Sequence, residues 1–171
     1  MKKVKYFLAV LVVLVVFAVC FLSGEAATTI KDKSLSRIPT STQYVIRFDE
    51  SSYKGAVYRK TGRKDYFVQV GSFNVAFPLK RTRFGNYKVS SYRRWTGISG
   101  KTQYYYCTYI QNFTGYIHSP LWKKGDYGRL KYPFDLTLYG KKSGGCLRVP
   151  IFWAQWIYKN VKAGTGVRIQ R

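Results

Sequence analysis

The stretch Ser143–Arg148, which reads SGGCLR, places Cys146 in a glycine-rich bend just ahead of a segment with helical character. A cysteine reacts as its thiolate, and small neighbours leave the sulfur accessible while backbone N–H groups converge on an attacked carbonyl oxygen. The only histidine of the chain, His118, lies upstream of this bend. A cysteine and a histidine act as nucleophile and base wherever the fold brings them together, so the pair predicts thiol chemistry.

The residues around this bend predict a single, mostly β domain of the sandwich or barrel type. Short runs of β-branched and aromatic residues alternate with turn residues, and we expect strands at 43–48, 55–59, 66–70, 73–77, 86–90 and through Cys107. A loop around Gly97 and Gly100 is expected between the last two. After the bend, the spacing predicts a short helix over 151–159, with Ile151, Ala154, Ile157 and Tyr158 on its packed face, and then a strand at 165–169.

The N-terminus has the features of a secretory signal. Lysines precede an apolar run from Tyr6 to Leu22, and small residues before Ala27 suit cleavage after Ala26. We therefore expect residues 1–26 to be a signal peptide, 27–42 a tether and 43–171 the folded domain. An uncleaved membrane anchor is the alternative, although the run is short for a span of roughly 20 residues. The protein is therefore expected to be exported, to the extracellular space or a cell wall.

The chain is strongly basic, with 30 Lys and Arg against 7 Asp and Glu and a formal net charge of +23. A field of this sign attracts polyanions, either acidic cell-wall polymers or nucleic acid. Predicted export argues against nucleic acid, so anionic wall polymers are the expected partners. No stable membrane insertion is expected once the signal is removed.

Two cysteines, Cys107 and Cys146, follow the predicted signal, and an oxidising compartment makes a disulfide between them an alternative to consider. Their contexts argue against it. Cys107 lies in a run of strand-forming residues, where a small thiol serves as packing, whereas Cys146 lies in the glycine-rich bend. The segment Pro120–Lys142 lacks clear periodicity and is expected to be a long loop over the site.

Other chemistries are poorly supported by the sequence. One histidine and two cysteines match none of the usual zinc spacings, and the few carboxylates are scattered rather than paired. We therefore expect neither a metal nor a cofactor. Thiol acyl transfer remains, with Cys146 as nucleophile, His118 as base and the N–H groups of Gly145 and Cys146 as oxyanion donors. We expect His118 and the positive field to lower the pKa of the thiol.

The pattern resembles the catalytic domain of the L,D-transpeptidases, the YkuD-like family of bacterial cell-wall enzymes. Their motif has a histidine, a spacer, then Ser or Thr, His, Gly, Cys, an apolar residue and Asn or Arg. Ile117–Ser119 is similar to its first part and Ser143–Arg148 to its second. Weaker similarity extends to Thr82–Tyr87 and to the segment 156–169.

The resemblance implies that Cys146 attacks a carbonyl of a peptidoglycan stem peptide, releases the terminal D-alanine and forms a thioester that a neighbouring amine resolves. It implies that the backbone carbonyl of Ser119 orients His118, that Arg148 either supports the site or contacts substrate, and that Ser143 contacts substrate. The second motif histidine is Gly144 here, and the spacer after His118 is long. Since the proposed base is the upstream histidine, activity is expected to survive this replacement.

Two other functions remain open on sequence alone. A non-catalytic module would bind anionic wall polymer or nucleic acid through its Arg and Tyr residues. An L,D-carboxypeptidase would use the same cysteine site but let water resolve the thioester. Sequence does not separate a transferase from a hydrolase, because the difference lies in which acceptor reaches the acyl-enzyme.

Overall fold

The computed structural model describes residues 28–78, 82–113, 115–131, 138 and 143–171. The predicted signal peptide and its cleavage site therefore lie outside the described residues. No helix within the described part of the chain is long and apolar enough to cross a membrane.

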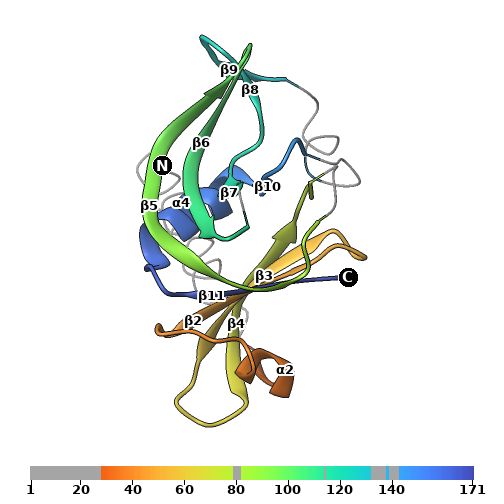
Figure 1. Cartoon of the computed structure of the whole chain (residues 1–171), viewed down its shortest axis with the longest axis vertical. Helices are drawn as coiled ribbons and strands as arrows, with labels where there is room; N and C mark the ends of the chain where they lie inside the picture. The colour runs from red at the N-terminus through yellow and green to blue at the C-terminus, as the bar shows by residue number, and fades with distance from the viewer. Residues whose placement is uncertain (1–27, 79–81, 114, 132–137, 139–142) are drawn as a thin grey trace, which may run out of the picture.

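One curled sheet makes up most of the fold (Figure 1). Its strands are joined in the order β1-β4-β3-β2-β11-β5-β6-β7-β10, and β8 joins β6 to β9 at one end. The first strands are β1 (Thr29–Lys31), β2 (Tyr44–Asp49), β3 (Lys54–Lys60) and β4 (Tyr66–Asn74). They are followed by β5 (Gly85–Ser99), β6 (Thr102–Gln111), β7 (Gly115–His118), β8 (Trp122–Lys123), β9 (Asp126–Leu130), β10 (Leu147–Arg148) and β11 (Gly166–Gln170). The mostly β prediction is confirmed.

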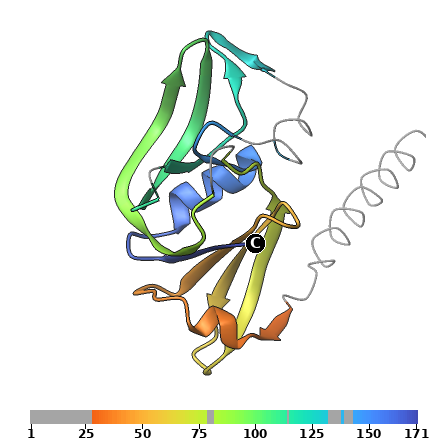
Figure 2. The same ribbon diagram turned by 45° about the vertical axis from the view of Figure 1, so that its right-hand side comes forward.

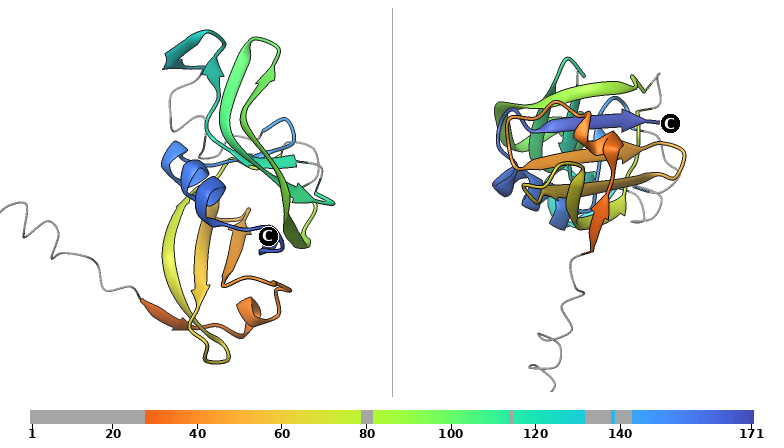
Figure 3. Two further views of the ribbon diagram at one scale, coloured as in Figure 1. Left: turned by 90° about the vertical axis from the view of Figure 1, so that its left-hand side faces the viewer. Right: turned by 90° about the horizontal axis from the view of Figure 1, so that it is seen from below.

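Helix α4 (Ile151–Asn160) begins three residues after β10 and lies in the hollow of the curled sheet (Figures 2 and 3). Its Ala154 and Ile157 are buried in the main core, and Trp153 and Trp156 pack against that core. Ile151, expected on the packed face, is 40% exposed, because the first turn projects beyond the sheet. The Arg93 guanidinium of β5 holds the other end of the helix by donating to the carbonyls of Ile157, Tyr158 and Val161.

The sheet gives this core its residues from both halves of the chain. Its strand side chains come from β2, β3, β4, β5, β6, β7, β10 and β11 and include Ile46, Phe48, Val57, Phe73, Val89, Ile110, Ile117, Leu147, Val167 and Ile169. Because side chains alternate along a strand, burying Ile117 and Leu147 on this side turns His118 and Cys146 to the other face of the sheet. The core thus fixes which face carries the candidate site.

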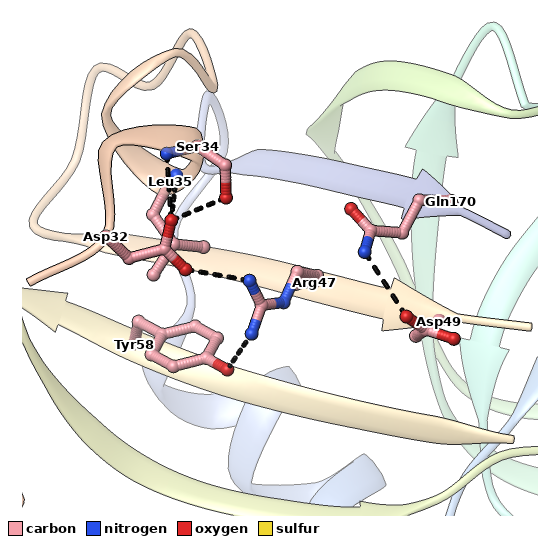
Figure 4. Close-up of polar contacts among 7 residues, drawn as sticks. All are labelled: Asp32, Ser34, Leu35, Arg47, Asp49, Tyr58 and Gln170. Carbon is pink, nitrogen blue, oxygen red and sulfur yellow. Dashed lines mark hydrogen bonds and ion pairs between the residues drawn. The ribbon is translucent and has the colours of Figure 1, made fainter. Parts of the chain in front are cut away.

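The segment expected to be a tether is instead part of the fold. Strand β1 pairs with β4, and helix α2 (Lys33–Ser36) follows it with Asp32 as its N-cap. Leu35 and Ile38 are buried in a second small core against β2, β3 and β4. Figure 4 shows the Asp32 carboxylate accepting from Ser34 and Leu35 and pairing with Arg47 at 2.8 Å. Strand pairing, two buried apolar side chains and a capping carboxylate thus dock a segment that is otherwise polar.

Two expected loops also contain strand. β5 runs without a break through Gly97 and pairs with β6 as far as Ser99, so only the turn at Gly100 separates them. β8 and β9 form a short hairpin inside the segment predicted to be a long loop, while residues 132–137 and 139–142 lie outside the described residues. A twisted hairpin of β5 and β6 therefore extends well beyond the core (Figure 1).

Candidate active site

Strands β7 and β10 bring the two halves of the sequence motif side by side. They pair in parallel, with Leu147 opposite Ile117 and Arg148 opposite His118. Cys146 directly precedes β10, and the backbone N–H of Tyr116 in β7 donates to its Sγ at 3.5 Å. Since His118 is two residues beyond Tyr116 on the same strand, its side chain points to the same face as that of Tyr116. The only histidine therefore lies on the strand that contacts the thiol.

The bend before Cys146 is built by Ser143. Its N–H donates to the Phe77 carbonyl, and its hydroxyl donates to the carbonyl of Cys146. The Gly145 N–H donates back to the Ser143 hydroxyl at 3.3 Å. Two backbone hydrogen bonds between Ala76 and Arg148, at 3.0 and 3.1 Å, then hold the following strand. Ser143 is 1% exposed and so shapes the bend from inside.

A glycine on β7 lets the bend approach that strand. A Cβ added to Gly115 would lie 2.5 Å from the carbonyl oxygen of Gly145, closer than real Cβ atoms come to other atoms. By contrast, Cβ atoms added to Gly144 and Gly145 would meet nothing within 4 Å. The close contact therefore needs glycine at Gly115, whereas space alone does not require glycine at Gly144.

His118 is held from its Nδ1 side. This nitrogen lies 2.6 Å from the backbone carbonyl of Ser119, which accepts a hydrogen bond and so selects the tautomer protonated at Nδ1. The Ser119 hydroxyl accepts from the Tyr105 N–H and donates to the Pro120 carbonyl, which fixes the turn that presents this oxygen. In this tautomer Nε2 carries a lone pair and is able to accept a proton.

Burial sets the charge state of the pair. Burial, and secondarily the nearby Arg148 guanidinium, lowers the pKa of His118 to about 3, although the Ser119 carbonyl opposes this shift. Burial also raises the pKa of the Cys146 thiol, with the Tyr116 N–H and Arg148 acting in the opposite direction. The expectation of a lowered thiol pKa was therefore wrong, because desolvation outweighs the nearby positive charge. At neutral pH the thiol and the imidazole are therefore both uncharged.

Aromatic residues that the sequence analysis did not select surround the pair. The Tyr104 ring of β6 lies against the His118 ring, with centroids 4.3 Å apart. Tyr116 packs against Tyr92 and Tyr109, and its hydroxyl is hydrogen-bonded to the exposed Arg94. In the sequence these tyrosines are typical strand residues, so only the aromatic density between Tyr104 and Tyr109 could have pointed to them.

The remaining predicted site residues also lie near the bend, although not all of them are exposed. Arg148 is 7% exposed and lies in register with His118, so it is placed to support the site more than to meet a large ligand. The Gly145 N–H, a predicted oxyanion donor, is already bonded to Ser143. Cys107 and Cys146 are both free thiols. Within the described ranges, no group of three His, Cys, Asp or Glu side chains is placed to hold a metal ion.

The fold has counterparts among solved structures, although no protein-family model and no curated protein sequence matches the chain. A fused Zn-dependent amidase/peptidase/peptidoglycan-binding domain-containing protein from Clostridium acetobutylicum matches with a TM-score of 0.58 and 20% identity, over 80% of this chain and 57% of its own. An L,D-transpeptidase from Mycobacterium smegmatis matches with a TM-score of 0.57 and 12% identity, over 75% of this chain and 59% of its own. L,D-transpeptidase 3 from Mycobacterium tuberculosis, in complex with a faropenem-derived adduct, matches with a TM-score of 0.54 and 16% identity, over 75% of this chain and 60% of its own.

The chain therefore has the fold of the L,D-transpeptidases. This confirms, at the level of fold, the resemblance that the motif around Cys146 indicates. The match spans about three-fifths of the length of these neighbours.

Proposed function

We propose that the protein is an L,D-transpeptidase that acts on peptidoglycan stem peptides through a thioester on Cys146. The observation that carries the proposal is the pairing of β7 with β10, which sets the free thiol of Cys146 against the strand that bears His118. The shared fold supports the same reading, since several neighbours are L,D-transpeptidases. A non-catalytic module would need neither a free thiol in this bend nor an imidazole fixed by the Ser119 carbonyl.

The neutral resting state defines the first step. Sγ of Cys146 attacks the carbonyl carbon of the third stem residue while its proton passes to Nε2 of His118. The Nδ1 hydrogen bond to Ser119 holds the imidazole as it becomes positive. Because Ser143 occupies the Gly145 N–H, we assign the oxyanion to the backbone N–H of Cys146.

Collapse of the tetrahedral intermediate breaks the peptide bond. The departing D-alanine amine takes the proton from His118, and the acyl group remains on Cys146 as a thioester. An amine of a neighbouring stem then attacks the thioester, giving its proton to His118, which returns it to the departing thiolate. Water in place of the amine would make the protein a carboxypeptidase.

The rest of the chain suits this setting. We propose that residues 1–26 direct export and that the large excess of Lys and Arg over Asp and Glu draws the protein to anionic wall polymers. Attraction of this kind concentrates an enzyme at its substrate without specifying a contact. No cofactor is needed for the reaction.

Covalent labelling tests the proposal. Intact-mass analysis after exposure to a carbapenem should show one adduct, lost in Cys146→Ser and kept in Cys107→Ser. A folded, reduced protein that forms no adduct would favour the binding module. Analysis of stem-peptide products with and without a D-amino acid acceptor then separates transferase from carboxypeptidase.

A further inference from the structure

The Tyr104 ring covers one face of the His118 imidazole. The ring centroids are 4.3 Å apart and the planes meet at 34°, a close and tilted ring contact. His118 is 3% exposed, and Tyr104 is one of the side chains that exclude water from it. Burial and the neighbouring thiol of Cys146 raise the pKa of the Tyr104 hydroxyl, so it is neutral when the site is at work.

The Tyr104 ring also lies close to bare backbone on the neighbouring strand β5. Gly97 is directly opposite Tyr104 in the pairing of β5 with β6. A Cβ added to Gly97 would lie 2.2 Å from Cε2 and 2.4 Å from Cζ of that ring. Gly97 has no positive φ, so what this position supplies is space. Tyr104 is therefore held between the Gly97 backbone and the imidazole.

A local irregularity in β6 aims Tyr104 at the site. Tyr106 has a φ of 55°, which interrupts the alternation of side chains along the strand. As a result Tyr106 packs toward helix α4, where its hydroxyl accepts from Gln155 at 2.9 Å, while Tyr104 lies on the opposite face with His118. A regular strand would have placed both rings on one face.

The hydrogen bond of His118 leaves one motion of the ring unrestrained. A contact between Nδ1 and the Ser119 carbonyl fixes one edge of the imidazole, yet the ring can still tilt about that edge. A stacked aromatic ring opposes that tilt, because tilting would drive the imidazole into the Tyr104 ring. The Gly97 backbone prevents Tyr104 from yielding in turn.

We propose that Tyr104 is a positioning residue for His118, and that its ring, seated on the bare backbone of Gly97, holds the imidazole plane so that Nε2 faces the thiol of Cys146. The role assigned to Nε2 rests on the proposed function, whereas the stack itself does not. The ring, rather than its hydroxyl, provides the effect. Tyr104→Phe should therefore retain it and Tyr104→Leu should lose it.

The single histidine makes the stack directly observable. In tag-free protein, the imidazole gives one set of NMR signals, which the Tyr104 ring current should shift upfield. Tyr104→Phe should keep that shift. Tyr104→Leu should abolish it, and Gly97→Ala should change it because the added methyl group displaces the ring. If Gly97→Ala does not fold, the two Tyr104 variants decide the question.

The rate of acylation by a carbapenem supplies the second measurement. Tyr104→Leu should acylate at least about tenfold more slowly than wild type, as expected when a base is displaced by a fraction of an ångström, while Tyr104→Phe retains most of the rate. The proposal is overturned if Tyr104→Leu keeps the wild-type rate or shift, or if Tyr104→Phe is as slow as Tyr104→Leu. If wild type is not acylated at all, the proposed function fails, and the NMR comparison still decides whether Tyr104 holds the imidazole.

Discussion

Acidification should destabilise this protein through His118. The folded-state pKa of about 3 lies far below the value of about 6.5 for an unfolded chain. Between these two values the unfolded chain binds a proton that the folded chain does not, so the free energy of unfolding falls as the pH falls. Stability is fully present above about pH 6.5 and is lost progressively as the pH drops toward the folded pKa.

The loss of unfolding free energy follows from the difference between the folded and unfolded pKa values of His118. One proton bound only by the unfolded state corresponds to about 1.4 kcal/mol per pH unit, so acidification from about pH 6.5 to 4.5 should cost about 2.5 kcal/mol. No other histidine titrates in this pH range, because His118 is the only histidine of the chain. Hydrogen bonds from neighbouring residues lower the pKa values of Asp32 and Asp49 despite some desolvation, so both stay ionised when folded in this range.

Urea unfolding of tag-free wild type and His118→Gln across this window measures the effect. The glutamine variant has no imidazole to titrate and should give a nearly flat profile, whatever its absolute stability. The comparison thus depends on the difference in slope between the two proteins. Parallel profiles would refute the reasoning, because they would mean that His118 binds a proton equally well in both states.

Three further predictions concern parts of the fold that position the site. Leu35→Ala should lower the free energy of unfolding by about 2 kcal/mol or more in chemical denaturation, because Leu35 is 1% exposed in the small core under α2. An unchanged denaturation midpoint would mean that this segment is undocked in solution. Arg93→Met should lower the free energy of unfolding by about 1–3 kcal/mol, because three carbonyls at the end of α4 lose a charged donor. Arg168→Met, which removes a half-buried arginine of β11 that donates to the Asn86 side chain, serves as its control. Gly144→His should change the unfolding free energy by no more than about 0.5 kcal/mol, since its Cβ meets nothing within 4 Å; a marked loss in thermal unfolding would show that the bend itself requires glycine.

The sequence was sufficient for the elements whose pattern is local. Alternating apolar residues located most strands, and the apolar positions Ala154 and Ile157 located the helix behind the nucleophile. The motif also selected Cys146 and His118, because thiol and imidazole are the reactive side chains in a chain with few carboxylates. Only the resemblance implied that Cys146 and His118 act together, since nothing in the spacing alone requires β7 to pair with β10.

Features that depend on distant contacts could not be predicted in this way. The docking of residues 28–41 depends on apolar side chains of β2, β3 and β4, which the polar composition of the segment does not show. The stack of Tyr104 on His118 depends on the register of two strands and on the positive φ of Tyr106. A tyrosine in a strand gives no sign of either.

The charge state of the site shows why net charge is a poor guide to local chemistry. A net charge of +23 suggests a thiol poised as thiolate, yet the pKa of Cys146 is raised. Charges on the surface are screened by solvent over roughly 10 Å, whereas desolvation acts on the sulfur itself. Arg148, buried in register with His118, is near enough to act on both groups, and it lowers the pKa of each. It adds to burial in disfavouring the protonated imidazole and opposes burial at the thiol, so a positive charge at this position favours the thiolate of Cys146 while weakening His118 as a base.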